Sequence, residues 1–408
     1  MSGESPCLGA FAADLRKWLG MSMALTAFMP PAEDGDLDGR GRRRREPLNL
    51  TYTSSEHLLT GCWVQGGRYW EVYAAVSPEK HSNTLRSGLC APAVCSHDET
   101  LSEIVPLHLQ VFFQEANLAR PELADARIVE LSSWSRVPID FVIAGDLFCG
   151  TTTLFQNLAR HPEIGFTSSG EDPALFSWRS LPTMDEVSRM NARRRDLMES
   201  GKQRPRIVGL DNPMMLRSPF VRQVLARIPR LVVLVISCDP VLRFAKWGAR
   251  RAQSDGHELD LESYLEASPL AEQIVLVGRH LKELHGLIGS RLVVVHQDYL
   301  RREPYRLFDA LARRLGVGPF PQGMQLHRYN SHSLPDTGLC RNASLLQAMV
   351  RRFSFDYEMI KDMLVRSGMP VPDGVRLRTG HCESPGLDAE DLGVCPVNDT
   401  RMPGHCRL

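Results

Sequence analysis

The sequence predicts an α/β protein with a parallel sheet of about five strands flanked by helices, preceded by a small cysteine-containing region. Continuous apolar runs such as Phe141–Ala144 and Leu231–Ile236 have the length of a strand, and they are typical of strands buried on both faces of a parallel sheet. A glycine-containing turn, residues 145–152, separates the first run from a stretch with helical periodicity. Because open α/β sheets bind ligands at the carboxyl ends of their strands, this turn is the first candidate site.

The composition limits the classes of partner. Lys plus Arg and Asp plus Glu number 48 each among 408 residues, which allows one large domain with smaller additions. This charge balance predicts no nucleic-acid partner and gives no sign of a membrane partner. Membrane association stays open only through the N-terminus.

Cysteine usage favours an oxidising compartment. The chain has ten cysteines, a high count for a cytosolic protein. Those outside the predicted α/β core are Cys62, Cys90, Cys95, Cys340, Cys382, Cys395 and Cys406. Disulfides explain that placement, and three glycosylation triplets, at Asn49, Asn342 and Asn398, point the same way. We therefore expect a secreted or lumenal glycoprotein, with a cytoplasmic location as the alternative.

Residues 1–47 are predicted to form a disordered or targeting segment with a linker. Arg16 and Lys17 precede an apolar run, residues 18–29, as in the charged and apolar parts of a signal sequence. The run is too short to span a bilayer, and a disordered or amphipathic N-terminus explains it equally well. The linker contains four consecutive arginines, residues 42–45, which we interpret as a solvated segment.

Residues 48–130 form a small region rich in cysteine and aromatic residues. Its sequence Gly88-Leu-Cys90-x-Pro-x-x-Cys95 resembles part of the extracellular domain of the nose-resistant-to-fluoxetine proteins. The resemblance implies a small domain stapled by disulfides, and we predict at least one disulfide among Cys62, Cys90 and Cys95.

The turn at residues 145–152 has the two-glycine spacing of a phosphate loop. Backbone N–H groups of such a loop and the start of the next helix hold an anion, and Thr151 or Thr152 can add a hydroxyl donor. An ordinary nucleotide triphosphatase is disfavoured, because its pattern requires Lys where this chain has Thr151. A tight turn without a ligand is the alternative.

The strand, the loop ending Gly-Thr-Thr and the helix closing in His-Pro-Glu-Ile resemble the 5′-phosphosulfate loop of sulfotransferases, chiefly the Golgi heparan-sulfate type. These enzymes use 3′-phosphoadenosine 5′-phosphosulfate (PAPS). The resemblance implies a P-loop-like sulfotransferase fold. It also implies that the cofactor-binding residues are Gly145, Cys149, Gly150, Thr151, Thr152 and Thr153. The family's loop Lys is replaced by Phe148, which cannot supply a cation.

A second block, Glu171-Asp172-Pro173, resembles the family segment Lys-Glu-Pro, whose Glu takes the proton of the acceptor hydroxyl in heparan-type members. The resemblance implies that Asp172 is the catalytic base. An ordinary surface turn with solvated acids is the alternative.

A third block follows the run ending at Ile236 and resembles the family's 3′-phosphate site, Arg-[Asp/Asn]-Pro-x-x-Arg-x-x-Ser. Asp239, Pro240 and Arg243 match, whereas Cys238 stands in place of the Arg and Lys246 in place of the Ser. The resemblance implies that Arg243 and Lys246 bind the cofactor, with Lys246 as a catalytic cation. A solvated helix face is the alternative.

The remaining elements complete a domain over residues 137–370. We predict further strands at Ile207–Leu210 and from Arg291, helices at Phe220–Ile228 and Pro304–Leu315, and a closing loop at Leu326–Ser344 with His327, Arg328 and Arg341 as anion donors. The extension 371–408 carries Gly-His-Cys twice, at 380–382 and 404–406. Its spacing matches no zinc finger, so we predict disulfides there and no metal site.

Two functional hypotheses result. The first is a PAPS-dependent sulfotransferase of the Golgi lumen or secreted space, acting on a hydroxyl of a glycan or other acceptor. The second is a catalytically impaired binding or scaffold protein with the same fold, because Phe148, Asp172 and Cys238 depart from the family pattern. A nucleotide kinase with Asp239 or Asp298 as a magnesium ligand is disfavoured, because the loop has no Lys.

Overall fold

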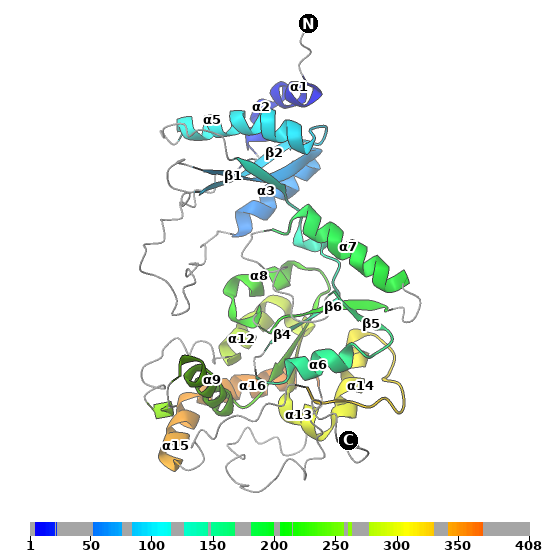
Figure 1. Ribbon diagram of the computed structural model, residues 1–408, viewed down its shortest axis with the longest axis vertical. Helices are drawn as coiled ribbons and strands as arrows, with labels where there is room; N and C mark the ends of the chain where they lie inside the picture. The colour runs from blue at the N-terminus through cyan, green and yellow to red at the C-terminus, as the bar shows by residue number, and fades with distance from the viewer. Residues whose placement is uncertain are drawn as a thin grey trace. The chain divides into compact units, whose positions relative to one another are not determined.

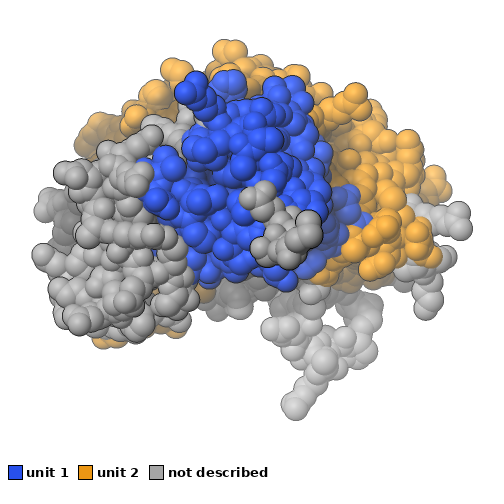
Figure 2. Space-filling view, turned by 90° about the horizontal axis from the view of Figure 1, so that it is seen from above, with its two compact units in different colours: residues 1–137, 177–191 blue, residues 138–176, 192–408 orange. Residues whose placement is uncertain are grey.

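The computed structural model describes residues 5–20, 22, 52–75, 84–115, 126–145, 148–167, 181–199, 205–213, 215–256, 260–262, 277–329 and 342–369. The chain divides into two compact units, coloured separately in Figure 2. Unit 1 comprises Met1–Val137 and Ser177–Asn191, and unit 2 comprises Pro138–Phe176 and Ala192–Leu408. Figure 1 labels their elements.

Unit 1 contains a three-stranded antiparallel sheet in the order β2-β1-β3, formed by β1 (Gly67–Ala75), β2 (Thr84–Pro92) and β3 (Arg127–Glu130). Helix α3 (Tyr52–Val64) packs on the first two strands. The adjacent side chains of Tyr69 and Trp70 point to opposite faces of β1, and both are buried. Both faces of this sheet are therefore covered.

Two disulfides join the sheet of unit 1 to its helices, which confirms the predicted disulfide in this region. Cys62 on α3 bonds to Cys90 on β2, and Cys95 bonds to Cys7. Cys7 lies on α1 (Pro6–Ala13), which is followed by α2 (Leu15–Gly20). The prediction of a disordered or targeting segment did not anticipate these two helices.

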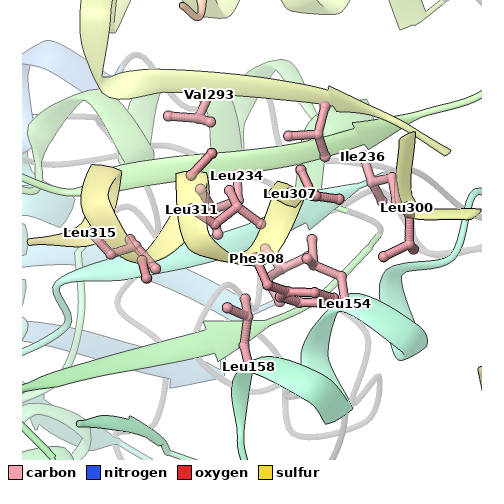
Figure 3. Close-up of a cluster of buried hydrophobic side chains, with 14 of the residues drawn as sticks. Leu154, Leu158, Leu234, Ile236, Val293, Leu300, Leu307, Phe308, Leu311 and Leu315 are labelled. Atoms are coloured by element: carbon pink, nitrogen blue, oxygen red, sulfur yellow. The ribbon is translucent and has the colours of Figure 1, made fainter. Parts of the chain in front are cut away.

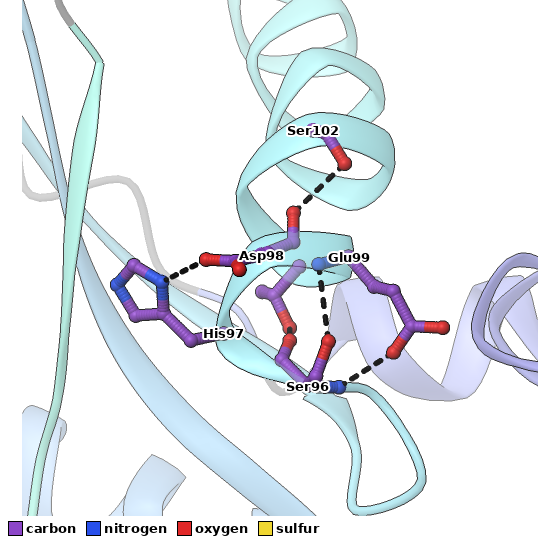
Figure 4. A network of polar contacts seen from close by, with 6 residues as sticks. Ser96, His97, Asp98, Glu99 and Ser102 are labelled. Atoms are coloured by element: carbon purple, nitrogen blue, oxygen red, sulfur yellow. Dashed lines mark hydrogen bonds and ion pairs between the residues drawn. The ribbon is translucent and has the colours of Figure 1, made fainter.

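A capping box begins the long helical segment of unit 1 (Figure 4). The segment consists of α4 (His97–Glu99), a π-helical turn at Thr100–Ile104 and α5 (Val105–Glu115). The backbone N–H of Ser96 donates to Glu99 Oε2 at 2.8 Å, and the Glu99 N–H donates back to Ser96 Oγ at 3.3 Å. These bonds satisfy two amides that would otherwise lack partners, so the helix has a defined start.

Unit 2 is built on a parallel five-stranded sheet in the order β5-β6-β4-β7-β8, as the sequence predicts. The strands are β4 (Phe141–Gly145), β5 (Ile164–Phe166), β6 (Ile207–Asp211), β7 (Val232–Ser237) and β8 (Leu292–His296). Every residue of β4, β5 and β8 is buried. The parallel order places the carboxyl ends of all five strands at one edge, where α/β sheets bind ligands.

One face of this sheet packs on helices α6 (Thr151–Leu158) and α14 (Pro304–Leu315), as Figure 3 shows. The apolar cluster includes Leu154 and Leu158 from α6, Leu234 and Ile236 from β7, Val293 from β8, Leu300, and Leu307, Phe308, Leu311 and Leu315 from α14. Residues alternate in each strand, so the neighbours of Leu234 and Val293 face the other side.

Further helices complete unit 2. They are α8 (Pro219–Arg227), α9 (Pro240–Asp255), α12 (Val277–Ile288), α13 (Gln297–Arg302), α15 (Ala343–Arg352) and α16 (Ser354–Arg366). Helix α12 packs on α8 and α16. Helix α7 (Met184–Glu199) has residues in both units. Within the described residues, no helix has both the length and the apolar composition needed to cross a membrane.

Candidate functional site

The predicted anion loop connects the carboxyl end of β4 to the start of α6. Gly145 is the last residue of β4 and Gly150 is the N-cap of α6, where it makes no side-chain capping bond. Gly150 has φ 101° and Phe148 has φ 66°, both in the left-handed region. Glycine adopts this conformation at no steric cost, whereas Phe does not. The first amides of α6 have no acceptor within the helix, so this helix start can receive an anion.

The threonines after Gly150 have different surroundings. Thr151 is buried and Thr152 is half-buried at the first turn of α6. The Thr153 hydroxyl donates to the Tyr329 carbonyl and accepts from the Tyr329 N–H, at 3.1 Å each. Thr153 therefore anchors the start of the predicted closing loop, residues 326–329, beside α6. A role of these threonines in cofactor binding stays a prediction.

A disulfide between Cys149 and Cys238 lies at the same edge of the sheet, with a Cα–Cα distance of 5.2 Å. Cys149 directly precedes the N-cap of α6, and Cys238 directly precedes Asp239, the N-cap of α9. Both cysteines had been placed in candidate sites by the sequence. Their pairing was not predicted, because 89 residues separate them and no local pattern marks it.

Phe148, in the loop before α6, packs against α9. Its ring meets the Trp247 ring edge to face, with centroids 5.9 Å apart. The Arg250 guanidinium lies 5.6 Å from the centre of the Phe148 ring, and that of Arg217 lies 5.2 Å from the centre of the Trp247 ring. Two arginines thus flank the aromatic pair beside the loop, through cation–π contacts.

Three cations from separate segments meet near the loop. We call Lys246 on α9, Arg301 on α13 and Arg328 the basic cluster. Burial, followed by repulsion from Arg301 and Arg328, lowers the pKa of Lys246 to about 8. Burial and Arg328 likewise lower the pKa of Arg301, although Asp298 opposes the change, 3.9 Å away. The sequence singled out Lys246 and Arg328 but missed Arg301.

Two carboxylates and a histidine adjoin the basic cluster. Asp298 and Asp239 both act to raise the pKa of Lys246. Three cations against two carboxylates leave one positive charge in excess. His296 is buried, and burial lowers its pKa, so it is neutral near pH 7. Its Nδ1 accepts from the Asp298 N–H at 3.3 Å, which leaves the proton on Nε2.

Two buried polar atoms of this group have no hydrogen-bond partner among the described residues. They are Nε2 of His296 and Oδ2 of Asp239. The other Asp239 oxygen accepts from the N–H groups of Val241 and Leu242, at 2.9 and 3.0 Å, and from the Tyr357 hydroxyl at 2.9 Å. Buried polar atoms are nearly always bonded, so a polar ligand or water is expected beside these two.

The structure does not test the roles of Arg243 and Asp172, two further residues singled out by the sequence. Arg243 is only 3% exposed, and its charge helps lower the pKa of His280 to about 4, after burial and Arg222. Asp172 and Arg341 lie outside the described residues. Their predicted roles, and that of Arg243, stay predictions.

No model of a known protein family matches the chain, and no curated protein matches it. Among solved structures, it is similar to a sulfotransferase from Alicyclobacillus acidocaldarius, with 20% identity over 56% of this chain and 96% of that chain and a TM-score of 0.41. It is also similar to the sulfotransferase domain from the curacin biosynthetic pathway, with 13% identity over 58% of this chain and all of that domain and a TM-score of 0.37. A third similar structure is the sulfotransferase domain from the Synechococcus PCC 7002 olefin synthase, with 16% identity over 58% and 96% of the two chains and a TM-score of 0.33.

Proposed function

We propose that the protein transfers a sulfuryl group from PAPS to a hydroxyl acceptor, and that the basic cluster holds the 3′-phosphate. The observation that carries the proposal is that Lys246, Arg301 and Arg328 act on one another electrostatically, and that α13, which carries Arg301, packs beside the loop: a β-carbon at Gly150 would lie 3.4 Å from Leu300 Cδ2 and 3.6 Å from Gln297 Nε2. Each comes from a different segment, so the fold itself assembles them. The motif resemblance around residues 145–153 and 238–246 supports the same ligand.

The energetics of the basic cluster favour an anionic ligand. Burial and like charge make the protonated form of Lys246 unfavourable, as its lowered pKa of about 8 indicates. An anion placed among the three cations reverses that repulsion and forms charge-assisted hydrogen bonds. The protonated Nε2 of His296, which has no partner among the described residues, adds a neutral donor at the same place.

Within this proposal, different residues bind different parts of the cofactor. PAPS supplies the sulfuryl group and departs as adenosine 3′,5′-bisphosphate. The amides at the start of α6, with Thr151 and Thr152, hold its 5′ end, because they lie at a helix N-terminus. Lys246, at the 3′-phosphate with the rest of the basic cluster, adds positive charge that stabilises the departing bisphosphate. Asp172 accepts the proton of the acceptor hydroxyl.

The acceptor and the compartment belong to the proposal as well. A glycan hydroxyl is the acceptor that the resemblance to Golgi sulfotransferases implies. The three disulfides among the described residues fit an oxidising space, so we propose a Golgi-lumen or secreted location.

Calorimetric titration with adenosine 3′,5′-bisphosphate tests the proposal. The unmodified protein should bind it more tightly than ATP. Lys246→Met and Arg328→Met should each weaken binding about 10- to 100-fold, because each removes a charge-assisted contact. Lys282→Met is the matched control, since Lys282 is an exposed lysine on α12 of the same unit. Equal loss in all three variants, or a preference for ATP, contradicts the assignment.

Transfer itself needs a second measurement. Single-turnover reactions with labelled PAPS and a panel of glycan and other hydroxyl acceptors should give labelled product with the unmodified protein. Asp172→Asn should lower the rate about 100-fold or more while changing bisphosphate binding little, because a general base contributes typically about 100- to 10000-fold to rate and need not touch the cofactor. Binding without transfer to any acceptor favours a non-catalytic binding protein.

A further inference from the structure

The Cys149–Cys238 disulfide joins the amino ends of two helices that border the candidate site. Cys149 lies one residue before the N-cap of α6, and Cys238 lies one residue before the N-cap of α9. The strands that lead to them, β4 and β7, are parallel neighbours in the sheet. The bond therefore fixes the start of α6, with its anion-binding amides, to the helix that carries Lys246.

The two helix starts need this bond to different degrees. At α9 the Asp239 carboxylate caps the helix through the N–H groups of Val241 and Leu242. At α6 the N-cap is Gly150, which has no side chain and makes no capping bond. A capping side chain normally fixes the entry of the chain into a helix. At α6, the disulfide at Cys149 fixes the entry of the chain into the helix in place of a capping side chain.

The conformation next to Cys149 also requires a restraint. Phe148 and Gly150, on either side of it, have φ values of 66° and 101°. A left-handed conformation is unfavourable for a residue with a Cβ, so Phe148 keeps it only where the surroundings hold it. Its ring contact with Trp247 is one restraint, and the disulfide at the next residue is the other.

We propose that the Cys149–Cys238 disulfide is the positioning element of the anion site, so that the protein binds its bisphosphate ligand tightly only when this bond is intact. The inference rests on the proposed function for the identity of the ligand. Both cysteines are buried, at 0% and 6% exposed, so the bond belongs to the site edge and not to the surface. The disulfide stands where the family resemblance places a phosphate-binding Arg, and it acts by geometry instead of charge.

The core of unit 2 keeps the domain folded without this bond. The apolar cluster beneath α6 and α14 includes both cysteines but also many other buried residues. A second cluster, which joins Phe244 of α9 to Phe353, does not include them. Removing the disulfide should lower the free energy of unfolding, as for any long cross-link. If the bond only stabilised the fold, its removal would not loosen residues 148–153 in the folded protein. If the bond positions the loop, its removal should cause local loss of order at these residues.

The test compares the unmodified protein with Cys149→Ala/Cys238→Ala, and uses Cys62→Ala/Cys90→Ala as the control for loss of a disulfide in unit 1. Titration with adenosine 3′,5′-bisphosphate should show about 10-fold or weaker binding in the first variant only, because preorganisation is lost. Hydrogen exchange should become at least about 10-fold faster at the amides of residues 148–153, with β7 unchanged.

The outcomes separate this inference from the proposed function. If the unmodified protein binds and the Cys149→Ala/Cys238→Ala variant binds equally well, the positioning role is wrong and the ligand assignment stands. If the unmodified protein does not bind, the ligand assignment fails, and hydrogen exchange at residues 148–153 still decides whether the bond holds the loop. If β7 and β8 also lose protection in the variant, the bond is a staple of the fold and the inference is overturned.

Discussion

The two units of this protein use disulfides for different purposes. In unit 1, Cys62–Cys90 attaches α3 to β2, and Cys7–Cys95 attaches α1 to the segment that follows β2. Such bonds restrict the unfolded chain and so add to the stability of the folded unit. In unit 2, the Cys149–Cys238 bond lies at the carboxyl edge of a five-stranded sheet with an extensive core. All six bonded cysteines are buried, so the two units differ in what each disulfide joins: a helix to a strand or loop in unit 1, and two helix starts beside the candidate site in unit 2.

Loss of a disulfide in unit 1 should give the largest change in stability. Cys62→Ala/Cys90→Ala should lower the free energy of unfolding of unit 1 by about 2–5 kcal/mol, because the unfolded chain without the cross-link has more conformational entropy. Hydrogen exchange in β1 and β2 measures it, with β4 and β7 as the internal reference. Protection that persists in β1 and β2 would show that the core of unit 1 suffices without the bond.

Acid should destabilise both units, through the buried His108 in unit 1 and the half-buried His280 in unit 2. Burial lowers the pKa of His108 to about 4, and its ring is 3.0 Å from the Ser87 hydroxyl. The unfolded chain gains the proton near pH 6.5, so stability present above that pH is lost as pH falls towards 4, by up to about 3 kcal/mol. His108→Gln should flatten this slope in unit 1, and His97→Gln, at an exposed position, should not.

The effect of salt on the acid-dependent loss of stability should differ between the two units. The pKa of His280 in unit 2 is also lowered to about 4, by burial and then by repulsion from Arg222 and other arginines. Salt screens charge repulsion but not burial. Raising the salt concentration should therefore reduce the acid-dependent loss in unit 2 more than in unit 1, as followed by exchange at β8 and β1. Equal salt effects in the two units would contradict the assignment of burial alone to His108 and of burial with arginine repulsion to His280.

Most of the sheet of unit 2 can be read from the sequence, because β4, β6, β7 and β8 are apolar runs between clear boundaries. Helix α14 was predicted with its observed bounds, from its initial Pro, its apolar face and the glycine that ends it. Strand β5 was missed, because its three residues contain a glycine and show no period. Short edge strands acquire their conformation from the partner strand and not from local propensity.

The site was predictable only where one segment carries it. The loop after β4 and the cap of α9 follow local patterns, so the sequence identified Gly150, Lys246 and Asp239. Arg301 joins Lys246 only when α13 turns back beside α9, and the Cys149–Cys238 pair forms only when β4 and β7 become neighbours. Both contacts depend on strand order, which the sequence does not specify by local pattern.

Close contacts between a strand glycine and an aromatic ring occur in both units, and they offer a matched test of packing. A β-carbon at Gly209 would lie 2.2 Å from the Phe141 ring, and one at Gly88 would lie 2.1 Å from the Tyr69 hydroxyl. Gly209→Ala and Gly88→Ala should each destabilise their own unit by about 1–3 kcal/mol through overpacking. Denaturant titration followed by exchange in β6 and β2 assigns the loss. Gly286→Ala is the control, because nothing lies within 4 Å of a β-carbon there.

Replacing Lys246 should instead stabilise unit 2 while it weakens ligand binding. The folded protein holds the pKa of Lys246 at about 8, below its ordinary value of 10.5, so the folded state binds this proton less tightly than the unfolded chain does. The penalty is fully present below pH 8 and is relieved as pH rises towards 10.5. Lys246→Met should therefore raise the free energy of unfolding by about 1–2 kcal/mol at pH 7, allowing for the residual exposure of Lys246, and by little near pH 10.5.

The affinity of the unmodified protein for adenosine 3′,5′-bisphosphate should change with pH in the opposite sense. It should fall as pH rises through about 8, because the ammonium group loses the charge that holds the anion. Denaturation of the unmodified protein, Lys246→Met and Lys282→Met at pH 7 and pH 10, with titrations over the same range, measures both effects. A Lys246→Met protein that is less stable at pH 7 than the unmodified protein would show that this lysine stabilises the fold of unit 2. The candidate site would then not lower the stability of unit 2, as we expect it to do.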